Sequence, residues 1–251
     1  MIRFDDVHKS FGSRTILNGV SFEIPPHKTT VIFGISGGGK STIIKHIVGL
    51  LQPDSGDIYV DDVKVNEAND KQLLHVRKKV GFLFQHGALF DSMNIRDNVA
   101  FPILEHQKLS KNDVDRIVDE KLLMVGLDPK VVRTLYPDEL SGGMRKRVGL
   151  ARTLALEPEI ILYDEPTSGL DPVTSDLITQ MIRHLQSTLG MTSVLISHDI
   201  NESFKAGDHF LMLFDGKIIA QGDETYFRTT DNAVIQQFIN SRSEGPISFD
   251  H

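Results

Sequence analysis

Apolar and polar positions along this chain show two kinds of pattern, one typical of strands and one typical of helices. The kind of pattern changes along the chain. Runs rich in valine, isoleucine and phenylalanine predict strands towards the N-terminus, because β-branched and aromatic residues favour extended backbone. These runs occupy residues 2–7, 15–24, 29–34, 56–65 and 80–85, and the run at 56–65 reads as a hairpin. After a glycine cluster, apolar residues recur at helical spacing from Lys40 to Gly49, which predicts a helix.

The pattern becomes helical between residues 88 and 157, where Ser110 is placed to cap a periodic segment that closes at Gly126. Strands and helices then alternate, with strands at 159–164, 192–197, 209–214 and 217–222 and helices after Pro172 and from Asn201. This alternation predicts an α/β fold with a mostly parallel sheet and a helical insert at about 88–157. We expect one domain over residues 1–251, ending in a tail at about 241–251.

Composition narrows the class of protein. Of the 251 residues, 40% are apolar, enough for a substantial core, but no apolar run approaches the ~18 to 20 residues of a membrane-spanning helix. The first residues include Asp5 and Asp6 and no apolar stretch typical of a secretory signal. The lack of cysteine excludes disulfides and thiol chemistry, and the net charge of −7 lacks the basic excess of most nucleic-acid binders.

The strongest chemical signal is GISGGGKST, from Gly34 to Thr42, between a predicted strand and a predicted helix. It fits the phosphate-loop pattern G-x-x-x-x-G-K-[ST], whose glycines let backbone N–H groups surround a phosphate at a helix N-terminus. Lys40 would reach the β and γ phosphates, and the Ser41 hydroxyl would bind Mg²⁺. The competing interpretation is a glycine-rich turn beside a surface lysine. The expected nucleotide contacts are Gly34, Ser36, Gly37, Gly38, Gly39, Lys40, Ser41 and Thr42.

Polar residues also close three other predicted strands. Asp164 and Glu165 end the apolar segment IILYDEP, Gln85 ends VGFLFQ, and His198 follows TSVLIS. Asp164 can hold Mg²⁺, usually through water, and Glu165 can act as general base beside an attacking water. Gln85 suits a metal or water contact, and His198 suits a hydrogen bond to a γ-phosphate. Ligands bind at the carboxyl ends of parallel strands, so we expect these residues to converge, although each alone is compatible with an ordinary strand-end polar residue.

The segment LSGGMRKRV, Leu140 to Val148, places a serine and two glycines ahead of a basic helical stretch. One interpretation makes Ser141 a helix N-cap and Gly142 and Gly143 a flexible entry. Another offers the free N–H groups of the helix start to an anion. The bases from Arg145 to Arg147 are compatible with a solvated face that complements the helix dipole.

Together these motifs resemble the nucleotide-binding subunit of ABC transporters. The order of phosphate loop, Gln85, LSGG, DEPTSGLD and His198 is that family's order, and the resemblance spans nearly the whole chain. It implies a P-loop NTPase fold with an N-terminal antiparallel β subdomain that binds and hydrolyses ATP with Mg²⁺. It also implies adenine stacking by Phe11, which by composition could equally be core. The implied metal ligands are Ser41, Gln85 and Asp164, and the implied catalytic residues are Lys40, Glu165 and His198.

In this family the signature contacts ATP bound to the opposing subunit, so the resemblance implies that Ser141, Gly142 and Gly143 face a partner's nucleotide. The loop SGLD, residues 168–171, would join the two sites. The fifth signature residue is usually glutamine, but here it is Met144, whose side chain donates no hydrogen bond to a nucleotide sugar. This variant, with FQHGALFDSMNIRDNVAFP, is similar to the Mla branch of bacterial ATPases, which drives phospholipid transport.

The chain has one phosphate loop and one signature, so a complete site requires a homodimer or a paired homologous ATPase. Transport requires integral membrane permease subunits, which imply a peripheral position on the cytoplasmic side of the inner membrane. Leu89 and Phe90 form an apolar pair that is either a permease docking surface or core. In the tail, Ile247 and Phe249 either dock on the partner subunit or belong to a frayed end.

The function that these features favour is powering phospholipid transport between bacterial membranes. Alternatives are the ATPase of an importer for small polar solutes such as amino acids, and a non-transport ABC ATPase in DNA repair or translation. No feature favours nucleic-acid binding, and the long coiled coil or tandem domain that such non-transport proteins need is absent from the sequence.

Overall fold

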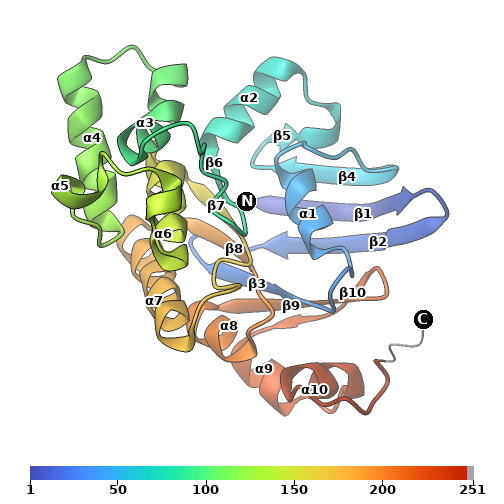
Figure 1. Ribbon diagram of the computed structural model, residues 1–251. Coiled ribbons are helices and arrows are strands. Elements are labelled where there is room, and N and C mark those ends of the chain that lie inside the picture. Colours follow the sequence, from blue (N-terminus) through green and yellow to red (C-terminus); the bar gives the residue numbers. More distant parts are fainter. Residues whose placement is uncertain (248–251) are drawn as a thin grey trace.

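The N-terminal part of the chain forms the antiparallel sheet that the resemblance implied. The computed structural model describes residues 1–247 (Figure 1). Four strands pair antiparallel in the order β2-β1-β4-β5. Their bounds are β1 (Ile2–Phe11), β2 (Arg14–Ile24), β4 (Ser55–Val60) and β5 (Val63–Lys64), with a 3₁₀ turn η1 (Val65–Glu67) after β5. Phe4 and Phe22 stack across the β1 and β2 pair, in a core shared with the helix that follows the phosphate loop.

The second sheet is mostly parallel, as the alternating pattern predicted. Its strand order is β10-β9-β3-β8-β7-β6, and only the β9 and β10 pair is antiparallel. The bounds are β3 (Thr29–Phe33), β6 (Val80–Leu83), β7 (Ile160–Asp164), β8 (Thr192–Ile196), β9 (His209–Phe214) and β10 (Lys217–Gly222). Along β3, Val31 and Phe33 enter one core and Ile32 enters the other, so the sheet is covered on both faces.

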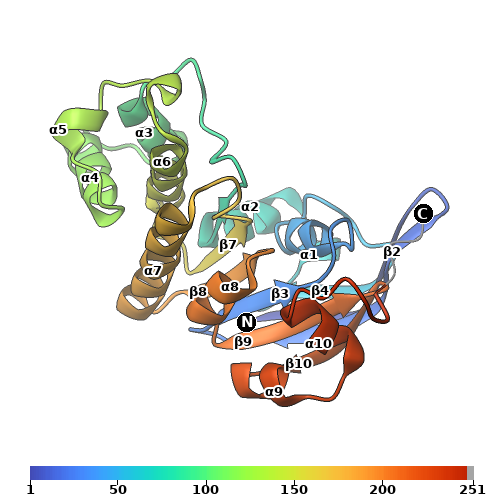
Figure 2. The same ribbon diagram turned by 60° about the horizontal axis from the view of Figure 1, so that its bottom comes forward.

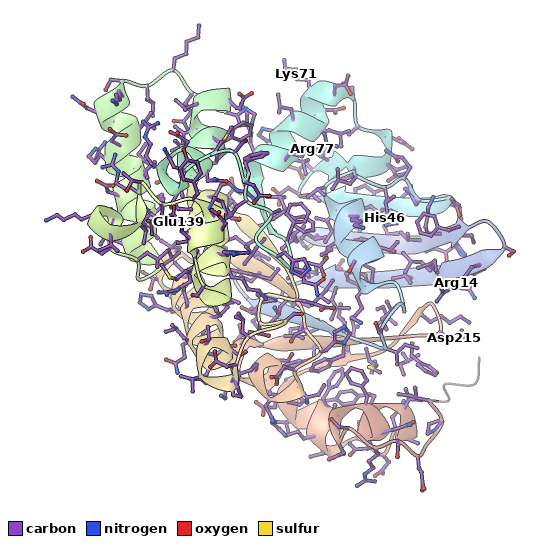
Figure 3. All side chains as sticks on the ribbon, in the orientation of Figure 1. Arg14, His46, Lys71, Arg77, Glu139 and Asp215 are labelled. Atoms are coloured by element: carbon purple, nitrogen blue, oxygen red, sulfur yellow. The ribbon has the colours of Figure 1, made fainter. Side chains whose placement is uncertain are left out.

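Two helices follow β3 and precede β6 along the chain. Helix α1 (Lys40–Ile47) was predicted, whereas α2 (Asp70–Lys79) was not. Asn69 begins α2 with a capping box to Gln72, and only Val76 of this helix is buried, so no apolar stripe marks it in the sequence. Arg77, labelled in Figure 3, donates from α2 to the carbonyl oxygens of Val48 and Gly49 at the end of α1.

The helical insert forms a lobe beside the parallel sheet, and Figure 2 shows the lobe standing apart from the antiparallel sheet. Its core joins that of the sheet through residues such as Leu83 and Tyr163. The helices are α3 (Ile95–His106), α4 (Lys111–Met124), α5 (Pro129–Val132) and α6 (Gly142–Leu154), with a 3₁₀ turn η2 (Pro137–Glu139), and all fall within 88–157. Ser110 caps α4 as predicted, by accepting a hydrogen bond from the Asp113 amide.

Further helices follow the lobe in the chain, and their buried apolar residues belong to the core shared with the parallel sheet. The helices are α7 (Pro172–Leu189), α8 (Ile200–Ala206), α9 (Glu224–Thr229) and α10 (Ala233–Ile239). Helices α9 and α10 were not predicted; Phe227 of α9 packs against Phe33 and Phe210 of the sheet, and Ile235 of α10 is buried in the same core. None of the helices within residues 1–247 is long and apolar enough to span a membrane.

The tail that we expected at about 241–251 folds back on its own chain as far as it is described. Ile247 is only 4% exposed, and the side chain of Gln237, also buried, accepts from its amide at 2.7 Å and donates to its carbonyl oxygen at 3.1 Å. Ile247 is therefore covered by its own chain rather than left free for a partner. Phe249 lies outside the described residues.

Candidate functional site

The carboxyl ends of neighbouring parallel strands bring the predicted residues to one edge of the sheet. In β3, β7 and β8, Ile32 and Asp164 both pair with Ile196, so the three strands end level. A cavity of about 250 Å³ opens at this edge. Its walls are Ile16, Ser36, Gly37, Gly39, Lys40, Ser41, Thr42, Glu165 and His198.

The glycines of the phosphate loop are needed for space and for backbone conformation. A Cβ on Gly34 would lie 2.5 Å from the carbonyl oxygen of Leu213, and one on Gly39 would lie 2.8 Å from the side chain of Ile16. Gly37 and Gly39 have φ angles of 70° and 101°, which favour glycine. Gly39 is the N-cap of α1, so no side chain covers the first N–H groups of that helix, and they can bind an anion.

Lys40 lies under this loop and is 5% exposed. Its ammonium group donates to the carbonyl oxygens of Gly34 and Ile35, at 2.7 and 2.8 Å. Burial lowers the pKa of Lys40 to about 8, although Glu165 and Asp164 nearby act in the opposite direction. A buried ammonium group held against the loop in this way is suited to bind phosphate oxygens there.

The Ser41 hydroxyl donates to a carboxylate oxygen of Asp164 at 3.2 Å, so two predicted metal ligands are neighbours. Burial raises the pKa of Asp164, and the hydrogen bond from Ser41 partly opposes this rise. Within residues 1–247, no group of three His, Asp or Glu side chains is arranged to hold a metal ion. Mg²⁺ at this site would therefore depend on the Ser41 hydroxyl, the Asp164 carboxylate, the side-chain amide oxygen of Gln85 and ligand oxygens, a set that suits this ion when it is bound with phosphates.

Glu165 is held from both sides by the other two predicted strand-end residues. The Nε2 atom of His198 lies 2.7 Å from one carboxylate oxygen, and the Gln85 amide donates to the other at 3.2 Å. The φ angle of Glu165 is 50°, a left-handed conformation that is uncommon outside glycine, and its amide donates to the carbonyl oxygen of Ile196. The sequence expectation that Gln85, Glu165 and His198 converge is therefore met.

The signature residues lie outside the cavity formed by their own chain. Both views show α6 in the lobe, apart from α1 (Figures 1 and 2). The Ser141 hydroxyl accepts from the Met144 amide at 3.3 Å, so Ser141 is an N-cap, as the first interpretation proposed. Ser141 and Gly142 are exposed, whereas Gly143 is buried. A Cβ on Gly143 would lie 2.5 Å from the side chain of Thr174, so this glycine permits a close approach of α6 to α7.

Residues of the β1 and β2 hairpin adjoin the phosphate loop. Phe11 is 49% exposed, so it is not a core residue, and the Lys9 ammonium lies 5.5 Å from its ring centre. Two further residues were missed by sequence reasoning: Ile16 lines the cavity, and Arg14, at the start of β2 (Figure 3), donates to the carbonyl oxygen of Gly37. No motif marks either residue, because strand pairing alone brings them to the loop.

A parallel sheet, a glycine-rich loop opening a helix and a strand-end acid pair define a protein of the phosphate-loop nucleotide-binding class. Residues 17–168 match the family model described as ABC transporter. The chain belongs to the ABC transporter family, as its ATP-binding subunit.

Relatives in this family match over most of their length. "Probable ribonucleotide transport ATP-binding protein mkl" of Mycobacterium tuberculosis is 43% identical, over 98% of this chain and 68% of that protein. The intermembrane phospholipid transport system ATP-binding protein MlaF of Escherichia coli is 39% identical, over 99% of this chain and 92% of that protein. The solved dimer of a bacterial ABC transporter cassette superposes with a TM-score of 0.82 at 33% identity, over 89% of this chain and 98% of that one.

Proposed function

We propose that this chain is the ATPase that powers phospholipid transport between bacterial membranes, working as one domain over residues 1–251. The observation that carries the ATPase part is the position of Glu165, whose carboxylate borders the phosphate-loop cavity and is held by Gln85 and His198. The phospholipid part rests on similarity to a phospholipid transport ATPase over nearly the full length of both chains.

ATP would bind with its phosphates in the loop from Gly34 to Thr42. The N–H groups from about Gly37 onward would surround the phosphates, and Lys40 would turn from the loop carbonyl oxygens to the β and γ phosphates. Ser41, Asp164 and Gln85 would hold Mg²⁺, which supplies positive charge against the phosphates. The exposed ring of Phe11 would stack on adenine beside the cavity.

Hydrolysis would use Glu165 as general base. Water attacks the γ-phosphorus, its proton passes to the Glu165 carboxylate, and the bond to the β-phosphate oxygen breaks to leave ADP and phosphate. His198, which is 2.7 Å from Glu165, would exchange part of this contact for a γ-phosphate oxygen. Gln85 would keep the carboxylate oriented through its amide.

A complete site would need a second copy or a homologous ATPase. Ser141 and Gly142 are exposed and outside the cavity of their own chain, which fits a role on a partner's ATP. Met144 is partly buried and packs against the main core, so a role in packing would replace a contact with the nucleotide sugar. The acidic net charge agrees with a partner other than nucleic acid.

Permease subunits would dock between the sheet and the lobe. A cavity of about 350 Å³ lies there, and its walls include the aromatic residues Phe84, Phe90 and Phe101. Phe84 and Phe90 are each 40% exposed, whereas Leu89 is partly buried against the core. Of the apolar pair, Phe90 would therefore be the docking residue, whereas Leu89 packs against the core. Such docking would hold the chain on the cytoplasmic side of the inner membrane.

A second cargo class is favoured by one comparison, since a 43% identical relative is named for ribonucleotide transport. The deciding experiment purifies the chain with its membrane subunits and reconstitutes them between two vesicle populations. Labelled phospholipid should move between vesicles when ATP is added, and a Glu165→Gln complex should not support this movement. ATP-dependent uptake of labelled ribonucleotide, with no phospholipid movement, would replace the lipid assignment.

A further inference from the structure

Lys146 of α6 is buried without a carboxylate partner. It is 4% exposed, and its ammonium group lies 2.5 Å from the carbonyl oxygen of Ser168 and 3.4 Å from that of Glu165. It forms no ion pair with any side chain in the described part of the chain. Lys121, which is equally buried, instead pairs with Glu120 and Glu157.

This placement has a cost. Burial lowers the pKa of Lys146 to about 8, and the charge of Glu165 only partly offsets the effect. An apolar side chain of similar length would fill the same space without that cost. The role of the ammonium group therefore lies in what it binds. It binds two backbone carbonyl oxygens of one tight turn.

That turn carries Glu165 at one end and Ser168 at the other. The Ser168 amide donates to the carbonyl oxygen of Glu165 at 3.2 Å. Gln85 holds both ends through their side chains, by donating to the Glu165 carboxylate and to the Ser168 hydroxyl. Lys146 holds the same two residues through their backbone, so the left-handed conformation of Glu165 is fixed from the turn after β6 and from α6 together.

The helix that carries Lys146 begins at the signature. A Cβ on Gly142 would lie 3.5 Å from Leu170, and Gly143 approaches Thr174 closely, so the first turn of α6 packs on the chain just beyond the same turn. One rigid helix thus contacts residues 165 and 168 through Lys146 and residues 170 and 174 through its glycines. A shift of the signature surface must move the turn that carries Glu165.

We propose that Lys146 is a positioning residue, which ties the signature helix to the backbone of Glu165 and so sets the carboxylate for proton transfer. This inference rests on the proposed role of Glu165 as general base. Lys146 does not touch the nucleotide cavity, so its removal should lower turnover without weakening ATP binding.

The test compares Lys146→Met with Lys146→Arg and with the control Lys121→Met in the full chain. Lys121→Met removes an equally buried charge away from the site. In Lys146→Met, kcat should fall about ten- to a hundredfold while KM stays within about twofold, because small misplacements of catalytic groups cost rate. Lys146→Arg keeps charge and donors and should recover most of the loss. Lys121→Met should keep the parent kcat.

Thermal unfolding is measured for each variant, and if Lys146→Met does not fold, Lys146→Gln, which keeps N–H donors, takes its place. Equal kcat in Lys146→Met and Lys121→Met, or a loss confined to KM, would overturn the inference. Glu165→Gln is measured in parallel, so that failure of the proposed general base can be told from failure of the positioning role. Near-parent turnover in Glu165→Gln would show that Glu165 is not the general base. An inactive Glu165→Gln together with an unaffected Lys146→Met would overturn only the positioning role of Lys146.

Discussion

At the scale of single residues, the site depends on charges that water does not fully reach. Lys40, Lys146 and Asp164 all have pKa values shifted mainly by burial, downward for the two lysines and upward for the aspartate. Glu165 lies among them, and its two carboxylate oxygens face different partners, His198 and Gln85. Replacing one carboxylate oxygen of Glu165 by an amide nitrogen should therefore separate ATP binding from ATP hydrolysis.

Glu165→Gln should keep ATP binding and abolish turnover. The amide can still hydrogen-bond a water molecule, but it cannot take the proton that the reaction releases, so the rate should fall at least about a hundredfold. An ATP-bound dimer should accumulate, and it can be measured by light scattering after gel filtration with ATP. Turnover near the parent rate would show that another group is the base.

Lys146 should also make the stability of the protein depend on pH. Its pKa falls from 10.5 to about 8 on folding, so the unfolded chain binds more protons between these values. The free energy of unfolding therefore gains a contribution that rises with pH from about 8 to 10.5 and is level below 8. Denaturant unfolding of the parent and of Lys146→Met at several pH values isolates this slope as a difference. A difference that stays constant across this range would contradict the assignment.

At the scale of elements, side chains distant in sequence fix where segments lie. Arg77 attaches α2 to the end of α1, and Gln237 of α10 binds both backbone polar groups of Ile247. Ile247 lies in the wall of a cavity that also includes Ser36 and His198, so this residue lies beside the nucleotide site. Gln237 is thus the residue that sets where Ile247 lies.

Gln237→Leu should release the segment from Ser241 to Ile247. It leaves the buried amide of Ile247 without an acceptor, at a cost of about 1–3 kcal/mol. Hydrogen exchange of this segment should speed up while the sheet keeps its protection. The control Gln180→Leu changes an exposed glutamine whose side chain, within residues 1–247, bonds only Asp176, and it should alter neither region. Unchanged exchange in Gln237→Leu would mean that packing alone holds Ile247.

At the scale of the whole molecule, the phosphate loop and the signature belong to different parts of the fold. The loop joins β3 to α1 in the sheet region, whereas Ser141 to Gly143 begin α6 in the lobe (Figure 1). Because the cavity of one chain does not include its own signature, pairing of two chains is the arrangement that we propose for a complete site.

Mixing two inactive variants tests this pairing. Lys40→Ala damages the loop and Ser141→Arg blocks the signature surface, so each homodimer should be inactive at both sites. A mixed dimer concentrates both lesions in one site and leaves the other intact. Random pairing makes about half of the dimers mixed, so activity should return to roughly a quarter of the parent value if the sites act independently. Differential tags and nucleotide trapping confirm the mixed dimers, and mixed dimers that neither trap nor hydrolyse ATP would contradict the shared site.

Several elements of the fold left no trace that periodicity can detect. Helix α2 buries only Val76, with Leu73 partly buried one turn before it, so its apolar stripe is too short to stand out, and its local signals are a capping box and the bases of its last turn. Helices α9 and α10 were missed although Phe227 and Ile235 are fully buried, because each helix buries a single apolar residue and so shows no repeat. Long helices and strands with many buried residues were predicted because their patterns extend over several turns or repeats.

The sequence by itself determined the order of motifs, the glycines of the phosphate loop and the residues that end the parallel strands. These follow from local backbone conformation and from the rule that parallel strands end at one edge, so neighbouring residues carry the information. Only the tertiary structure decided that Lys146 binds the turn of Glu165, that Ile16 lines the cavity and that Phe90 rather than Leu89 is exposed. Those contacts join residues far apart in the chain, and their positions follow from packing, which no single stretch of sequence specifies.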